Sequence, residues 1–146
     1  MVNPLELLMA QHENGEFKRY DLILRYLAGM GIIDGTGAYK SEYKKMLNRV
    51  KPGLGDERYS RFPGLIKNMA TGYDENYPIP VKSNYRLIEG SHRLVIAIIY
   101  GFEAVPVAVK ESGGRDYDRG RMLRIGFTNE FVDMLDGVKK NLGGAR

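Results

Sequence analysis

The residues with the clearest chemical potential in this sequence are residues 89–93, which read Glu-Gly-Ser-His-Arg. A strand-like run, 85–88, precedes them, and an apolar, helix-like run, 94–100, follows them. A strand that turns through glycine into a helix directs backbone N–H groups and the positive end of the helix dipole at one spot. Arg93 adds a guanidinium group whose donors match phosphate oxygens. The stretch therefore predicts a phosphate-binding turn.

The composition limits the other functions that the chain can have. Its 146 residues are 43% hydrophobic and 27% charged, which predicts one globular domain over residues 1–146. The net charge of +4 suits a phosphorylated ligand but does not by itself predict DNA binding. The absence of cysteine excludes disulfides, thiolate metal sites and thiol catalysis. No signal-peptide pattern or run long enough to span a bilayer occurs, so we expect a cytoplasmic protein.

Apolar residues at helical spacing predict helices through the first half of the chain. The first helix is expected to begin at Asn3-Pro4 and to end at Asn14-Gly15. The second is expected over residues 20–30, followed by a glycine-rich loop from Gly29 to Gly37. Two more are expected over residues 39–50, ended by Pro52-Gly53, and over residues 62–69.

The pattern changes to strands after residue 76. Residues 77–81 and 85–88 predict a hairpin, with the prolines placing its first strand at a sheet edge. The apolar helix follows, and residues 105–109 predict another strand. Residues 111–120 predict an exposed loop, and a last helix is expected from an N-cap at Thr128 to Gly143-Gly144. The expected fold class is α/β of the α+β kind.

This order of elements divides the single domain into three expected parts. Residues 1–60 form a helical extension, residues 61–110 a core with a small mixed sheet, and residues 111–146 a basic loop with the C-terminal helix.

The segment from Phe62 to Val109 resembles the core of the ParB/sulfiredoxin-like superfamily. The resemblance lies in an ordered set of motifs: a helix containing Leu65-Ile66-Lys67-Asn68-Met69, a strand with Ile79-Pro80-Val81, the turn from Glu89 to Arg93, a helix with Ala97, then Gly101 and a strand with Val105-Pro106-Val107. The resemblance implies a ParB/sulfiredoxin-like fold, also known as the ParB-like nuclease domain fold. It also implies that a nucleotide or phosphoester binds at the turn.

Departures from named members restrict the activity that the resemblance implies. Sulfiredoxins have a cysteine in a Gly-Cys-His-Arg turn where this chain has Ser91, and serine excludes sulfinic acid repair. Chromosome-partition ParB proteins typically have Gly-Glu-Arg-Arg, whereas this chain has His92, and too few residues follow Val109 for a helix-turn-helix domain. The Asp-Gly-His-His-Arg turn of the free-serine kinase branch is the most similar to residues 89–93.

That similarity implies an enzyme that transfers phosphate from ATP or ADP to a small hydroxyl-bearing or phosphorylated compound. The candidate residues for binding the nucleotide and its phosphates are Gly90, Ser91, His92 and Arg93. His92 is also a candidate catalytic residue. Glu89 is the candidate base or Mg²⁺ ligand, and Asp74 and Glu75, in the loop before the first strand, are further catalytic candidates.

Two other functions remain open: a non-catalytic module that binds a phosphoester or nucleotide, and a ParB-like DNA-binding protein or nuclease. The mild charge and the lack of a recognition-helix motif argue against nucleic acid. Purely structural roles also remain open, with Ser91 as a helix cap, His92 facing solvent, and Glu89 paired with Lys82 or Arg86.

Two further features predict structure more than chemistry. A run of arginines, 115, 119, 121 and 124, is interrupted by aspartates and predicts a solvated loop, or a lid over a phosphorylated ligand. Tyr39 and Tyr43 are expected in the core or in a groove wall.

Overall fold

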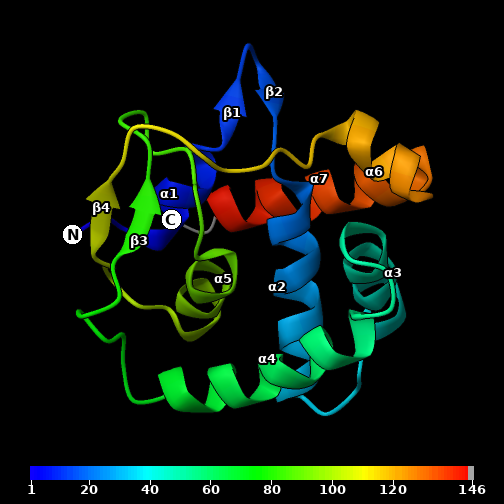
Figure 1. Ribbon diagram of the computed structural model, residues 1–146, viewed down its shortest axis with the longest axis horizontal. Coiled ribbons are helices and arrows are strands. Elements are labelled where there is room, and N and C mark those ends of the chain that lie inside the picture. The colour runs from blue at the N-terminus through cyan, green and yellow to red at the C-terminus, as the bar shows by residue number, and fades with distance from the viewer. Residues whose placement is uncertain (145–146) are drawn as a thin grey trace.

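Helices carry most of the chain, and its two sheets are small (Figure 1). The computed structural model describes residues 1–144. The strands are β1 His12–Glu13, β2 Glu16–Phe17, β3 Ile79–Val81 and β4 Val107–Val109. The helices are α1 Pro4–Met9, α2 Tyr20–Ile33, α3 Lys40–Val50, α4 Gly55–Met69, α5 Ser91–Tyr100, α6 Arg119–Ile125 and α7 Asn129–Gly144.

The unit β3-α5-β4 places the turn of residues 89–93. β3 and β4 pair in parallel, with Ile79 opposite Val107, so α5 forms the crossover between them. Figure 1 shows α5 beside this sheet, with α2 on its other side and α4 running below both helices. The expected strand–turn–helix–strand order is therefore present, and the chain is a mixed fold of helices and small sheets.

The expected hairpin forms only in part: residues 85–88 make a single antiparallel bridge, from Leu87 to Val81, flanked by hydrogen bonds from Lys82 N–H to the carbonyl of Arg86 and from Ile88 N–H to that of Pro80. The buried side chain of Gln11 accepts a hydrogen bond from the amide of Leu87 and donates one to the carbonyl of Tyr85. Tyr85 also has a φ of 67°, which bends the backbone out of an extended path. Gln11 therefore binds backbone groups of this segment that its pairing with residues 80–82 leaves free.

The first helix ends earlier than the sequence pattern predicts. It stops at Met9, and Asn14-Gly15 is the tip of the β1–β2 hairpin instead of a helix end. Asn14 and Gly15 have φ values of 53° and 76°, as the two central residues of a tight hairpin turn require. The prediction that Asn14-Gly15 ends the first helix was therefore wrong.

The expected loop at Gly29 to Gly37 was also partly wrong, because α2 continues through Gly29 and Gly31 to Ile33. Both glycines permit close packing. A Cβ atom on Gly29 would lie 2.8 Å from Cδ1 of Ile99, and one on Gly31 would lie 2.6 Å from the backbone nitrogen of Ala38. Neighbouring segments therefore require these glycines inside the helix, where their low helix propensity would otherwise be unfavourable.

The other expected elements lie close to their predicted positions. α3 and α7 form as expected, and Thr128 Oγ accepts a hydrogen bond from the amide of Phe131 at 3.1 Å. α4 begins at Gly55, seven residues before its apolar pattern starts, and the end of the expected loop after β4 is helical from Arg119.

The buried hydrophobic side chains form one cluster to which the N-terminal, central and C-terminal parts all contribute. Members from all three parts are at most 1% exposed, namely Ile23, Met46, Phe62, Leu94 and Leu135. Within residues 1–144, none of the helices has the length and apolar character needed to cross a membrane.

Candidate functional site

The N-terminus of α5 is open to a ligand because no side chain caps it. Gly90 is the N-cap residue, with a φ of 85°, and Ser91 is already the first helical residue. The expected capping role of Ser91 is therefore wrong. The first amides of an α-helix have no acceptor within the helix, and glycine has no side chain to provide one. These amides and the positive end of the helix dipole favour an anion at this position.

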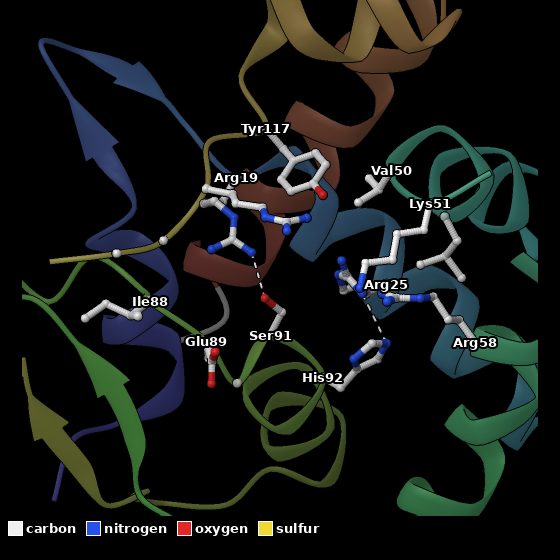
Figure 2. Close-up of a pocket in the computed structure, with 15 residues that line it drawn as sticks. Arg19, Arg25, Val50, Lys51, Arg58, Ile88, Glu89, Ser91, His92 and Tyr117 are labelled. Atoms are coloured by element: carbon white, nitrogen blue, oxygen red, sulfur yellow. Dashed lines mark hydrogen bonds between the residues drawn. The ribbon is translucent and has the colours of Figure 1, made fainter. Parts of the chain in front are cut away.

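A cavity of about 460 Å³ lies against this helix end (Figure 2). Its size falls within the range of small-molecule sites. Glu89 is the one carboxylate among its lining residues, which belong to the part of the chain that the structure describes. The lining includes five cationic side chains: Arg19, Arg25, Lys51, Arg58 and Arg115.

Arg19 and Arg25 are fixed by one buried carboxylate, that of Asp21. Arg19 Nε and Nη2 each lie 2.8 Å from an oxygen of Asp21, and Arg25 Nε lies 3.2 Å from Oδ2. Burial alone would raise the pKa of Asp21, but the charges and hydrogen bonds of the two arginines bring its pKa below the usual value. Because one carboxylate serves two guanidinium groups, a positive charge remains uncompensated at the cavity wall.

Ser91 is held by this network, since its Oγ accepts a hydrogen bond of 2.7 Å from Arg19 Nη2, drawn as a dashed line in Figure 2. α2 and the helix end of α5 are thereby joined through their side chains, and Arg19 is only 4% exposed. Ser91 thus helps to orient an arginine of the cavity.

His92 is an acceptor in the same network. Its Nε2 lies 3.1 Å from Arg25 Nη1 and also contacts the hydroxyl group of Tyr43. Arg25 Nη1 in turn donates to that hydroxyl oxygen at 2.8 Å. Burial, followed by the positive charge of Arg25, lowers the pKa of His92 to about 3. His92 is therefore neutral at physiological pH, with its proton on Nδ1.

Tyr43 supports His92 from the core. Its side chain is 0% exposed, and burial raises the pKa of its hydroxyl group. The expectation of a core or groove-wall tyrosine is confirmed, because the ring packs edge to face on Phe62 with the centroids 5.7 Å apart. Its hydroxyl group positions His92 and Arg25.

Lys51, Arg58 and Arg115 have no carboxylate partner among residues 1–144. They come from the end of α3, the first half of α4 and the segment after β4. Figure 2 shows Lys51 and Arg58 reaching toward the cavity from the side opposite Glu89. The end of α3, the first half of α4 and the segment after β4 therefore each contribute an unpaired cation to one concavity.

The segment after β4 closes the cavity near Ile88. A Cβ atom on Gly114 would lie 2.5 Å from the carbonyl oxygen of Leu87, so this close approach requires glycine.

Arg86 is 4% exposed and forms ion pairs with Glu13 and Asp116. The alternative in which Glu89 pairs with Arg86 is therefore not what the structure shows.

Arg93 lies on another side of the turn from the large cavity. Its guanidinium carbon is 4.8 Å from the ring centre of Tyr77, and the side chain lines a separate concavity of about 310 Å³ with Asn76, Glu89 and Gly90. Successive helical residues are about 100° apart around the axis, so Arg93 is directed about 200° from Ser91. The structure thus brings Glu89, Gly90, Ser91 and His92 to the large cavity, but not Arg93.

Asp74 and Glu75 are not at the large cavity either. Both are exposed in the segment between α4 and β3, where Asp74 Oδ1 accepts a hydrogen bond from the amide of Asn76 at 2.9 Å. Glu89 is the expected carboxylate that does line this cavity, and it is exposed at the rim.

Sequence reasoning missed most of the cations. One signal was present. Asp21 and Arg25 lie four residues apart within an otherwise apolar helical run, and charged side chains are rarely buried in such a run unless they are paired. For Lys51 and Arg58 no local signal exists, because only the packing of α3 and α4 directs them to the cavity.

Comparisons with protein-family models, with curated proteins and with solved structures find no match for this chain. The superfamily resemblance of residues 62–109 stays a prediction from motifs. The function is therefore inferred from the cavity itself.

Proposed function

We propose that the large cavity binds the phosphate groups of a nucleotide, ATP or ADP. One observation carries this proposal: five cationic side chains and the uncapped end of α5 face a concavity lined by a single carboxylate. Guanidinium groups bind phosphate through paired hydrogen bonds, and helix N-termini add amide donors. The resemblance to the ParB/sulfiredoxin-like superfamily supports the same ligand at the same turn.

The proposed reaction is transfer of a phosphoryl group to a small hydroxyl compound. The terminal phosphoryl group of ATP would pass to the acceptor oxygen, ADP would leave, and Glu89 would accept the hydroxyl proton. Glu89 supports this role because it lines the cavity and has no hydrogen-bond partner in the described part of the chain. Without turnover, the same geometry would make the protein a nucleotide-binding module.

Magnesium fits this arrangement only in a limited way. Residues 1–144 contain no group of three or more His, Cys, Asp or Glu side chains placed to hold a metal ion. Mg²⁺ in phosphoryl-transfer sites is usually held by one or two carboxylates together with substrate phosphates. Glu89 is the side chain that would serve as this carboxylate, and the cationic residues would neutralise the remaining phosphate charge.

The shape and charge of the cavity favour a small ligand over nucleic acid. A DNA-binding surface needs an extended row of cations along the phosphate backbone. Here, Asp116 and Asp118 lie in the same segment as Arg115 and Arg119, and the unpaired cations converge on a concavity.

A thermal-shift panel tests this function. ATP, ADP, CTP and GTP, each with and without Mg²⁺, are added to the wild type and to Glu89→Gln. A nucleotide at about a hundred times its dissociation constant adds about 2.7 kcal/mol to the free energy of unfolding. We expect ATP or ADP to stabilise both proteins, whereas phosphoryl transfer, followed with radiolabelled ATP and a panel of alcohols, is lost in Glu89→Gln.

Three outcomes would separate the alternatives. Stabilisation without turnover in the wild type would identify a binding module. No stabilisation by any nucleotide would contradict the site. Tight binding to DNA with a steep dependence on salt would support the nucleic-acid function instead.

A further inference from the structure

A second concave surface, about 350 Å³ in volume, lies next to the large cavity and carries three arginines. It is lined by Arg49 and Val50 of α3 and by Arg121, Arg124 and Ile125 of α6. We call it the α3–α6 arginine site. The sequence predicted Arg121 and Arg124 in a solvated loop, but both lie on a helix that faces the end of α3.

No carboxylate within residues 1–144 neutralises the three arginines of this site. Arg49 Nη2 donates to the carbonyl oxygen of Arg124 at 3.2 Å, and Arg121 Nη1 donates to that of Asp116 at 3.1 Å. Their side chains form no ion pair with a carboxylate of residues 1–144. In contrast, Arg119 of the same helix lies 2.7 Å from the carboxylate of Asp133.

A structural role explains only part of this cluster. Arg49 and Arg124 lie in the last turns of their helices, where a cation stabilises the helix dipole. That role accounts for the single hydrogen bond from Arg49 to the end of α6. Arg121 contacts the carbonyl of Asp116 and the ring of Tyr117, but it lies in the first turn of α6, where the dipole disfavours its positive charge. The presence of three arginines without a carboxylate partner around one concavity therefore points to an anionic ligand.

The two concavities share one wall. Val50 lines both of them, and Arg49 and Lys51, its neighbours in sequence, line the second and the first respectively. The ring of Tyr117 lines the large cavity, and the guanidinium carbon of Arg121 is 4.3 Å from its centre. Anionic groups bound in the two sites would therefore be neighbours separated by Val50 and Tyr117.

We propose that the α3–α6 arginine site binds the phosphate group of the acceptor, so that the acceptor is a phosphorylated small alcohol. This inference rests on the proposed function, in which the large cavity holds the nucleotide. A phosphate monoester carries nearly two negative charges and three terminal oxygens, which match several guanidinium donors. Its hydroxyl group would reach past Val50 toward the nucleotide in the large cavity.

The test is a calorimetric titration with glycerol 3-phosphate, the simplest phosphorylated alcohol, in the presence of saturating ATP. We expect the wild type to bind the probe and Arg124→Gln to weaken binding about tenfold, because one charge-assisted contact is lost. Arg124 is exposed and its side chain has no described partner, so this variant should fold. The double variant Arg121→Gln/Arg124→Gln should abolish binding.

Two controls make the outcome specific. Arg119→Gln removes a cation from the same helix but outside the site, and it should bind the probe as the wild type does. Lys51→Gln/Arg58→Gln removes two cations of the large cavity and should lose ATP binding while still binding glycerol 3-phosphate without ATP.

The failures of the two proposals are distinguishable. If ATP does not bind but glycerol 3-phosphate binds and depends on Arg121 and Arg124, the nucleotide proposal fails and the second site stands. Several results overturn the second site: no binding of the probe, binding unchanged in the double variant, or an equal loss in Arg119→Gln. Salt-dependent binding of a single-stranded oligonucleotide that requires both arginine clusters would also overturn it.

Discussion

The cations at the large cavity fall into two groups, one fixed by an ion pair and one unpaired. Arg19 and Arg25 are buried and share the carboxylate of Asp21, so their positions are fixed before any ligand arrives. Lys51 and Arg58 are unpaired and more exposed. Fixed donors contribute affinity at a low entropic cost, whereas the unpaired cations must be ordered by the ligand. The site therefore combines a rigid wall with adjustable side chains.

His92 makes the stability of the protein depend on pH. In the unfolded chain it binds a proton below its ordinary pKa of 6.5, but in the folded chain only near pH 3. The unfolded state therefore binds more protons between these values, and the free energy of unfolding falls as the pH falls through this window. The slope is at most about 1.4 kcal/mol per pH unit. Urea unfolding at pH 7, 6 and 5 measures it.

The matched variant for this prediction is His92→Gln, which retains a hydrogen-bond acceptor and cannot be protonated. Its stability should be nearly constant from pH 7 to pH 5. Parallel pH profiles for the wild type and His92→Gln would show that another group causes the dependence.

At the scale of elements, the conformation of Gly90 determines where α5 begins. Gly90 has a φ of 85°, and a Cβ atom there would lie 3.1 Å from Cγ2 of Ile79 in β3. The turn can therefore remain close to β3 while the first amides of α5 face the cavity. Gly101 ends the same helix with a φ of 70°, and nothing lies within 4 Å of its Cβ position.

Replacing each glycine by alanine distinguishes two effects. Gly101→Ala introduces backbone strain alone, whereas Gly90→Ala also displaces the turn at the start of α5. Both Gly90→Ala and Gly101→Ala should lower the free energy of unfolding by about 1–2 kcal/mol, because a left-handed conformation is unfavourable for alanine. The free energy of unfolding should fall further in Gly90→Ala, because the new Cβ atom contacts Ile79. Only Gly90→Ala should weaken ATP binding. Thermal unfolding and calorimetry measure the two effects. Equal ATP affinity in both variants would contradict the role of this helix end.

Sequence patterns predicted elements better than they predicted the site. The turn motif correctly located the start of α5 and the β3-α5-β4 order, because these depend on neighbouring residues. The contact of residues 85–88 with Gln11, more than seventy residues away in sequence, could not be predicted from neighbouring residues. Lys51 and Arg58 were missed for the same reason. The position of Arg93 could have been predicted from the sequence, because helical periodicity already places it on a different side of α5 from Ser91.

At the scale of the whole molecule, a mild net charge of +4 conceals a strongly uneven distribution. Many surface charges are paired, as Arg119 is with Asp133 and Arg61 with Glu57. Lys51, Arg58 and Arg115, which are unpaired, line the same concavity as Arg19 and Arg25. Like charges brought together in this way repel one another, so the folded protein retains an unfavourable interaction that an anionic ligand would relieve.

Calorimetric titration of ATP into the wild type, Arg58→Gln and Arg61→Gln tests the central claim most directly. Both arginines lie on α4, but only Arg58 lines the large cavity, whereas Arg61 pairs with Glu57 on the surface. We expect Arg58→Gln to weaken ATP binding about tenfold and Arg61→Gln to leave it unchanged. Because Arg58→Gln relieves repulsion, it should not lower stability without ATP. Equal ATP affinity in all three proteins would contradict the assignment of the cavity as the phosphate site.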